Sequence, residues 1–167
     1  SRIGDNYYIF DEYLPENCAR EQLVKVIKAK NDKKIITAIW GDPAGDATND
    51  SGVSTVQYMS SQGLTVHYST ETKKRSIPAG VEVVRSLICD AAGIRRLFID
   101  VDRCPQTTDA FESYSYPDKI TTDEPYKDGL WDHPMDAIRY LMVNVHGVGI
   151  PATAWVTGGE RDIRGPS

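Results

Sequence analysis

The side chains of this sequence that are best suited to chemistry are acidic, and several lie in the segment DHPMDAIRY (residues 132–140). Asp132 and Asp136 are one turn apart if the segment is helical, and His133 lies between them in the sequence. Another aspartate, Asp42, lies in an upstream Gly-Asp-Pro-Ala-Gly turn. Carboxylate oxygens are the ligands that Mg²⁺ and Mn²⁺ prefer. Together these residues predict a divalent-metal site that would assist the cleavage of a phosphodiester.

Each of these side chains also has an ordinary structural interpretation, which spacing alone leaves open. Asp42 could hydrogen-bond its own turn. Asp132 could cap the helix, with His133 as an exposed residue at that cap. Asp136 could form an i,i+3 ion pair with Arg139.

Hydrophobic patterns predict the elements that must position Asp42 and Asp136. A nearly continuous apolar run predicts a strand buried on both faces just before Asp42. Alternating strands and helices predict an α/β fold with a largely parallel sheet, in which ligands bind beyond the carboxyl ends of the strands. We expect strands at residues 7–14, 35–40, 64–69 and 96–101, and helices at residues 15–30, 53–62, 78–92, 107–114 and 132–145; a hairpin is the alternative for residues 53–62.

The composition is that of an ordinary globular protein. The chain has 167 residues, 40% hydrophobic and 26% charged, which predicts one domain with a sizeable core. No apolar run is long enough to span a membrane, and none near the start is typical of a secretion signal. The cysteines are odd in number and widely spaced, which favours a reducing compartment over a disulfide framework: Cys18, Cys89 and Cys104.

The net charge of -5 does not favour general binding of nucleic acid. Contact with a polyanion must then come from bound cations or from local basic patches. Lys73, Lys74 and Arg75 form such a patch in a predicted loop, where they could contact a phosphate backbone without reading sequence.

Five segments, taken in order, resemble the C-terminal nuclease domain of the large terminase subunit of tailed bacteriophages. The resemblance covers residues from about 5 to 145, and its most specific part is the last segment. The segments are YYIFDEY (7–13), WGDPAG (40–45), LFID (97–100), FESYSYP (111–117) and DHPMDAIRY (132–140).

This resemblance implies a ribonuclease-H-like fold, with a mixed, mostly parallel central sheet flanked by helices. It further implies an endonuclease that cuts concatemeric double-stranded DNA with two Mg²⁺ or Mn²⁺ ions. Asp42 and Asp136 would be metal ligands, Asp132 a further candidate ligand, and His133 a residue that orients a water or a phosphate. The implied partners are the terminase ATPase domain, the small terminase subunit and the portal protein, in the cytoplasm of a host bacterium.

The sequence departs from the family pattern in one respect. The family also uses an aspartate on its first strand, and residues 1–6 look too short for that strand and its turn. We therefore expect an N-terminally truncated nuclease domain at residues 1–146, with weak metal binding and little cleavage, and a loosely ordered tail at residues 147–167. A second alignment restores a complete catalytic triad of Asp42, Asp100 and Asp136.

Two other functions remain open at this point. One is a non-catalytic docking module of the packaging motor that binds DNA or portal. The other is a different ribonuclease-H-like nuclease, such as a resolvase or transposase core. The chain has no Gly-x-x-x-x-Gly-Lys-Ser/Thr phosphate loop, so we do not expect ATP hydrolysis.

Overall fold

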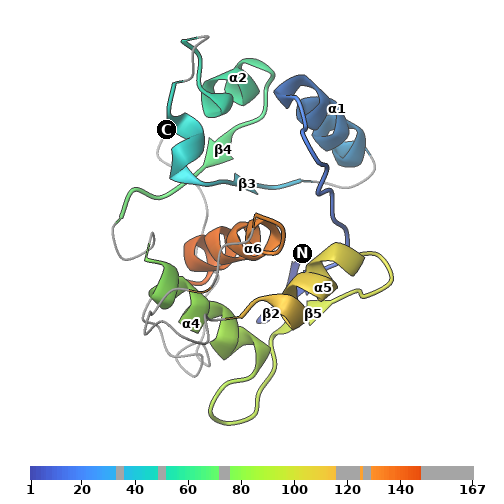
Figure 1. The fold of residues 1–167 in the computed structure, drawn as a ribbon, viewed down its shortest axis with the longest axis vertical. Coiled ribbons are helices and arrows are strands. Elements are labelled where there is room, and N and C mark those ends of the chain that lie inside the picture. Colours follow the sequence, from blue (N-terminus) through green and yellow to red (C-terminus); the bar gives the residue numbers. More distant parts are fainter. Residues whose placement is uncertain (33–35, 49–51, 72–75, 116–124, 126–128, 148–167) are drawn as a thin grey trace.

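The computed structural model describes residues 1–32, 36–48, 52–71, 76–115, 125 and 129–147. They form an α/β protein with a small mixed sheet (Figure 1). The elements in chain order are β1 (Arg2–Ile3), β2 (Asn6–Ile9), α1 (Arg20–Asn31), β3 (Ile39–Trp40), the 3-10 turn η1 (Pro43–Asp46), α2 (Thr55–Ser61), β4 (Val66–His67), α4 (Ile77–Ile88), β5 (Leu97–Ile99), α5 (Pro105–Ser113) and α6 (Asp132–Val145). The α/β prediction is confirmed.

The first sheet has the strand order β1-β2-β5. β2 and β5 are parallel, with Tyr7 opposite Leu97, and β1 adds to β2 as an antiparallel strand. The expectation that residues 1–6 are too short for a strand and a turn is therefore wrong. Two residues suffice for β1, because Gly4 takes the left-handed conformation (φ 58°) that a tight turn requires.

The hydrophobic core lies between this sheet, α4 and α6. Leu87, Met142 and Val143 are almost completely buried, with exposed fractions of 0%, 1% and 0%. Tyr7 on β2 and Leu97 on β5 belong to the same buried cluster, so one face of the sheet packs against these helices. The packing of α4 and α6 against each other is the most extensive helix contact of the described residues, so these helices fix the position of the candidate residues on α6.

The second sheet contains β3 and β4, which are parallel. The prediction that the strand before Asp42 is buried on both faces is wrong, since Ile36 is 36% exposed and Ile39 and Trp40 are only half-buried. In the described residues β3 has one strand partner, β4, which explains the exposure. β3 also contacts α6, which lies between β3 and the first sheet in Figure 1.

Several predicted boundaries shift in the structure. The first long helix begins at Arg20, not near residue 15, because Asn17 has a left-handed backbone (φ 50°) that a helix cannot include. The helix predicted for residues 53–62 is confirmed over a shorter span. Ser54 and Gln57 close its N-terminus with a reciprocal capping box, which favours the helix over the alternative hairpin.

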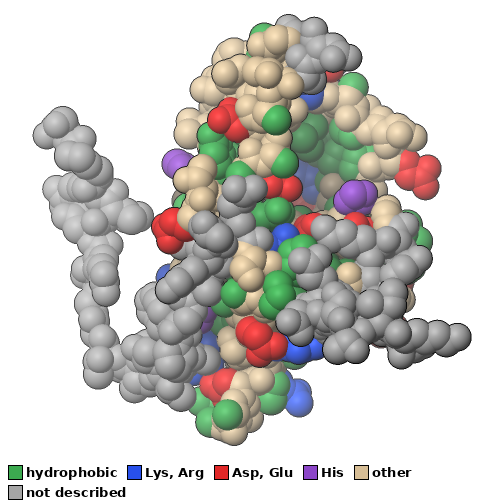
Figure 2. All heavy atoms as spheres, turned by 60° about the vertical axis from the view of Figure 1, so that its left-hand side comes forward, with side chains coloured by type: hydrophobic (Ala, Val, Ile, Leu, Met, Phe, Trp, Pro, Cys, Tyr) green, Lys and Arg blue, Asp and Glu red, His purple; other side chains and the backbone are tan. Residues whose placement is uncertain are grey.

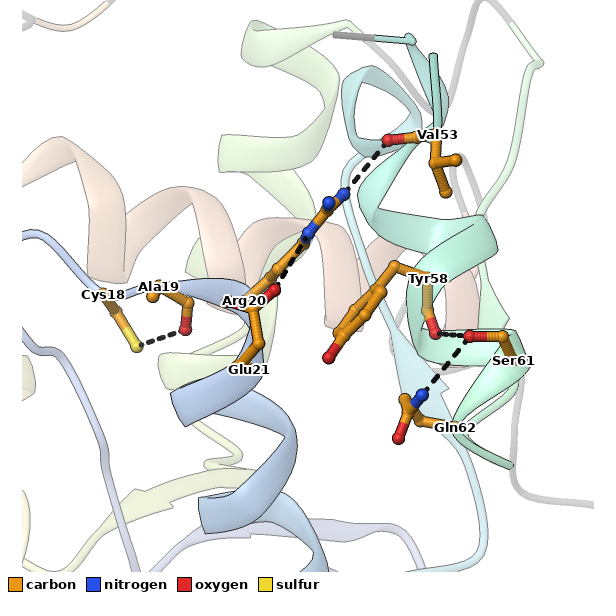
Figure 3. A network of polar contacts seen from close by, with 8 residues as sticks. All are labelled: Cys18, Ala19, Arg20, Glu21, Val53, Tyr58, Ser61 and Gln62. Atoms are coloured by element: carbon orange, nitrogen blue, oxygen red, sulfur yellow. Dashed lines mark hydrogen bonds and ion pairs between the residues drawn. The ribbon is translucent and has the colours of Figure 1, made fainter. Parts of the chain in front are cut away.

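One arginine joins the first two α-helices. The Nη1 atom of Arg20 donates a hydrogen bond of 3.2 Å to the carbonyl of Val53 (Figure 3). Its guanidinium carbon also lies 4.7 Å from the centre of the Tyr58 ring on α2. These contacts fix α2, and with it the loop from β3, against α1. No helix among the described residues combines the length and the apolar character that crossing a membrane requires.

Candidate metal site at the start of α6

Asp42 lies two residues after β3, at the N-cap of η1. Its Oδ1 atom accepts a 2.8 Å hydrogen bond from the backbone N–H of Ala44, so the carboxylate closes its own turn. The ordinary structural interpretation is therefore correct for this oxygen. The residue is exposed, and no described residue donates to the second oxygen, Oδ2. Asp42 thus keeps one carboxylate oxygen that a ligand could reach.

Asp136 lies in the second turn of α6 and also has its expected structural partner. Arg139 donates from Nε at 3.0 Å and from Nη2 at 2.8 Å. Both hydrogen bonds converge on one oxygen, Oδ1, and the described residues provide no donor to Oδ2. The Asp136 side chain is 27% exposed, so its second oxygen is also accessible.

The charges of both aspartates act on Tyr140, which follows Asp136 on α6. Burial raises the pKa of the Tyr140 hydroxyl, the nearby Arg139 opposes this rise, and the negative charges of Asp42 and Asp136 add to it. Both carboxylates therefore lie within electrostatic reach of one phenol, although 93 intervening residues separate them in the sequence. The contact between α6 and β3 produces this proximity.

Asp132 and His133, at the start of α6, have different surroundings. Asp132 is the first helical residue, not the N-cap, which is Trp131. It is only 8% exposed, and its Oδ1 atom has no hydrogen-bond partner among the described residues. His133 is exposed and lines a cavity of about 650 Å³ together with Trp131 and Tyr13. A buried carboxylate oxygen without a donor favours a cation in its vicinity.

Asp100 lies in a different acidic region, beyond the carboxyl ends of β2 and β5. Its Oδ1 atom accepts a 3.2 Å hydrogen bond from the backbone N–H of Arg103. Burial raises the pKa of the neighbouring Cys104 thiol, and the charges of Glu12, Asp100 and Asp11 raise it further. The structure therefore groups Asp100 with these acids. The second alignment required Asp42, Asp100 and Asp136 to form one site, but in the described residues they do not form a group placed to hold a metal ion.

Lys73, Lys74 and Arg75 lie outside the described residues, as does most of the tail at residues 147–167. The residues that can be described include no group of three or more histidine, cysteine, aspartate or glutamate side chains placed to hold a metal ion. Asp132 offers a buried oxygen without a donor, and Asp42 and Asp136 each offer one oxygen, but the three aspartates do not form such a group.

Fold and site together define an α/β protein in which the strand before Asp42 contacts the helix that carries Asp136. The sequence matches no family model, and neither curated proteins nor solved structures give a significant match.

Two residues of this region were not identified from the sequence as contributors to a site. Tyr140 is four residues after Asp136, a spacing that places both side chains on one side of a helix, and this signal could have identified it. Arg139 was expected only as an ion-pair partner. Its burial, at 4% exposed, was not evident because an amphipathic reading places Arg139 on the flank of the helix.

Proposed function

We propose that this chain is a divalent-metal-dependent DNA endonuclease domain of a viral DNA-packaging terminase, with a ribonuclease-H-like fold. The observation that carries the proposal is the contact between β3 and α6, because Asp42 follows the strand and Asp136 lies on the helix. The order of the family-like segments along the chain supports it further. Host cytoplasm, double-stranded DNA and the other packaging proteins are the location and partners that this function entails.

In this proposal Asp42 and Asp136 hold Mg²⁺ or Mn²⁺ through the oxygens that lack donors among the described residues, and Asp132 does not form one group with them. Two such cations supply charge stabilisation at the attacking and leaving oxygens of a phosphodiester. His133 is exposed in the first turn of α6, where its imidazole can orient a water or a phosphate oxygen. Asp100 has no role in this arrangement, because it belongs to the other acidic region.

The charge distribution is consistent with a binding mode that depends on cations. On the face drawn in Figure 2, acidic and basic side chains of the described residues alternate among apolar and neutral ones. With a net charge of -5, the chain as a whole would repel DNA at long range. Divalent ions at the acidic site would offset that repulsion locally.

A plasmid-nicking assay tests this function. The chain is incubated with supercoiled DNA and Mn²⁺, and the conversion to open circles is compared with that of Asp42→Asn. We expect slow nicking by the parent and roughly 100-fold less by the variant, since loss of a ligand should cost at least as much as loss of an outer-shell partner. Asp109→Asn, an exposed acid on α5, is the matched control and should nick like the parent.

Other outcomes would identify the alternative functions. Nicking that Asp42→Asn does not change would contradict the metal site and indicate a contaminating nuclease. DNA binding without nicking, with Mn²⁺ bound or absent, would favour the non-catalytic docking module. Preferential cutting of four-way junctions over linear duplex would favour a resolvase-like enzyme instead.

A further inference from the structure

A cavity of about 170 Å³ lies between α4, α5 and α6, where α6 contacts both of the other helices (Figure 1). Its lining is mostly apolar, and all three helices contribute to it: Val81, Val84, Ile88, Phe111 and Met135. An apolar cavity of about 150 Å³ is known to accommodate a benzene ring. The space therefore fits one ring, or a branched aliphatic group of similar size.

One buried charge lies among these apolar side chains. Arg139 lines the cavity and is only 4% exposed. Its stem crosses α4 at Gly80, where an added Cβ would come within 2.5 Å of the Arg139 Cγ atom. The guanidinium carbon also lies 4.3 Å from the centre of the Tyr140 ring. Contacts along the stem and over the face of the guanidinium thus hold it at the cavity.

The hydrogen bonds of this guanidinium are incomplete. Nε and Nη2 of Arg139 donate to Oδ1 of Asp136 at 3.0 and 2.8 Å. Nη1 is buried and has no acceptor among the described residues. A buried donor without an acceptor costs free energy comparable with the loss of a hydrogen bond. Because Nη1 is closed off from bulk water, its acceptor has to come from within the cavity.

The charges around the cavity favour an anion as that acceptor. Its described lining residues include two arginines, Arg85 and Arg139, and one acid, Asp136, which is already bound to Arg139. Arg85 pairs with Glu82 at 3.0 Å on the exposed side of α4, where such a pair contributes little and can yield to another anion. An anionic acceptor also forms a stronger hydrogen bond with a guanidinium than a neutral one does.

We propose that this cavity binds a small carboxylate with an apolar body, of about the size of benzoate. The body packs between α4, α5 and α6, and a carboxylate oxygen accepts the hydrogen bond of Arg139 Nη1. This site is independent of the proposed nuclease, because it requires neither DNA nor a metal ion. Its test is therefore carried out without both.

Benzoate is the probe, and its binding to the full chain is measured by titration in NMR spectra of backbone amides and methyl groups. Benzamide carries the same ring without the charge, and acetate carries the charge without the ring. We expect both to bind at least about tenfold more weakly than benzoate, because the first loses the charge-assisted hydrogen bond and the second loses the apolar contact.

Two substitutions locate the site. Arg139→Gln removes the guanidinium, and we expect it to weaken benzoate binding at least about tenfold, to the affinity of benzamide. Val81→Phe fills the cavity from a half-buried position on α4 and should abolish the binding of both ring compounds. The matched controls are Arg95→Gln and Val101→Phe, which make the same changes at exposed positions outside the cavity lining and should bind benzoate like the parent.

Circular dichroism shows whether each variant is folded. If either test variant fails to fold, the side-chain Nε–H signal of Arg139 in the parent decides, and it should shift with benzoate but not with benzamide. A signal that benzoate leaves unmoved would overturn the site. The absence of saturable benzoate binding by the parent would also contradict it, since water would then be the acceptor of Nη1. Equal affinities for benzoate and benzamide, or parent-like binding by folded Val81→Phe, would refute it as well.

Discussion

Two acidic regions of this molecule lie at the carboxyl ends of parallel strands, and they differ in the groups that their carboxylates bind. One follows β2 and β5 and contains Asp11, Glu12 and Asp100. The other follows β3 and combines Asp42 with Asp136 from α6. Sequence position would rank both as equally good metal sites, because ligands gather at such edges.

The acids beyond β2 and β5 hold the fold together. Asp11 accepts a 2.7 Å hydrogen bond from Lys30 of α1. Glu12 accepts from the backbone N–H groups of Gln106 and Thr107 at 3.0 and 2.9 Å, one with each oxygen, and so caps α5. Asp100 accepts from a backbone N–H in its own loop. Asp11 and Glu12 thus connect the segment after β2 to α1 and α5, whereas Asp100 bonds within its own loop, as Asp42 does.

The acids at the start of α6 keep oxygens that no described donor reaches. Asp42 and Asp136 each use only Oδ1, and Asp132 has a buried Oδ1 without any partner in the described part of the chain. The lesson is that proximity of acids is a weak indicator of a metal site. Unused oxygens alone do not separate the two regions, because Asp100 also uses only Oδ1; among the described residues the difference is the buried Oδ1 of Asp132.

The largest effect that separates the two regions should be on the binding of Mn²⁺. We expect Asp136→Asn to weaken binding at least about 10-fold, because a direct ligand should matter no less than an outer-shell partner. Asp100→Asn should leave the dissociation constant roughly unchanged. Titration calorimetry on both variants makes the comparison, and equal losses would show that the two regions form one site.

The second largest effect should be on the free energy of unfolding, and it should come from the acids beyond β2 and β5. Glu12→Gln loses one charged acceptor at the N-terminus of α5, and we expect it to lower the free energy of unfolding by about 1–2 kcal/mol. Urea denaturation at neutral pH measures this change. Binding of Mn²⁺ should not change; a weakened affinity with intact stability would reverse the roles assigned to the two regions.

A third prediction concerns Asp90, a carboxylate whose two oxygens are both engaged. Arg96 donates to Oδ2 at 2.8 Å, and the N–H groups of Ala92 and Ile94 donate to Oδ1. The hydrogen bond from Arg96, followed by that from Ile94, holds the pKa of this carboxyl below its ordinary value. Because the folded-state pKa is lowered, the stabilisation is complete above the ordinary pKa and is lost as pH falls through the folded one.

Urea unfolding of the parent and Asp90→Asn across the acid range checks this sign. The parent should be the more stable protein near pH 6, and the difference should shrink below about pH 4, where the carboxyl of the unfolded chain becomes protonated. A difference that stays constant down to about pH 2 would mean that packing, not the charge of Asp90, provides the stabilisation.

How much of the fold the sequence could predict depends on whether each element is determined by local signals or by contacts between distant segments of the chain. The helices at Asp132–Val145 and Thr55–Ser61 were predicted, because hydrophobic periodicity is a local signal, although the cap at Ser54 was not. The exposure of β3 was not, because the burial of a strand depends on how many strands pair with it. The same limit applies to β1, whose pairing with β2 is a tertiary event.

For the candidate site, the sequence identified the residues but not the state of their oxygens. The turn at Asp42 and the i,i+3 spacing of Asp136 and Arg139 were both recognised as structural alternatives, and both hydrogen bonds form. Gly80, which admits the Arg139 stem, lies on another helix, so no local pattern could connect the two. The grouping of Asp100 with Glu12 likewise depends on the parallel pairing of β2 and β5.

The smallest effect should come from the ion pair at the edge of the first acidic region. Lys30 and Asp11 are 35% and 29% exposed, so water screens their attraction, and Lys30→Met should cost less than about 1 kcal/mol of unfolding free energy. Lys28→Met, an exposed lysine in the same last turn of α1, is the matched control. A double-mutant cycle with Asp11→Asn isolates the pair from changes in helix propensity. A coupling above about 2 kcal/mol would exceed what an exposed pair can provide, and Asp11 would then anchor α1 as firmly as Glu12 caps α5.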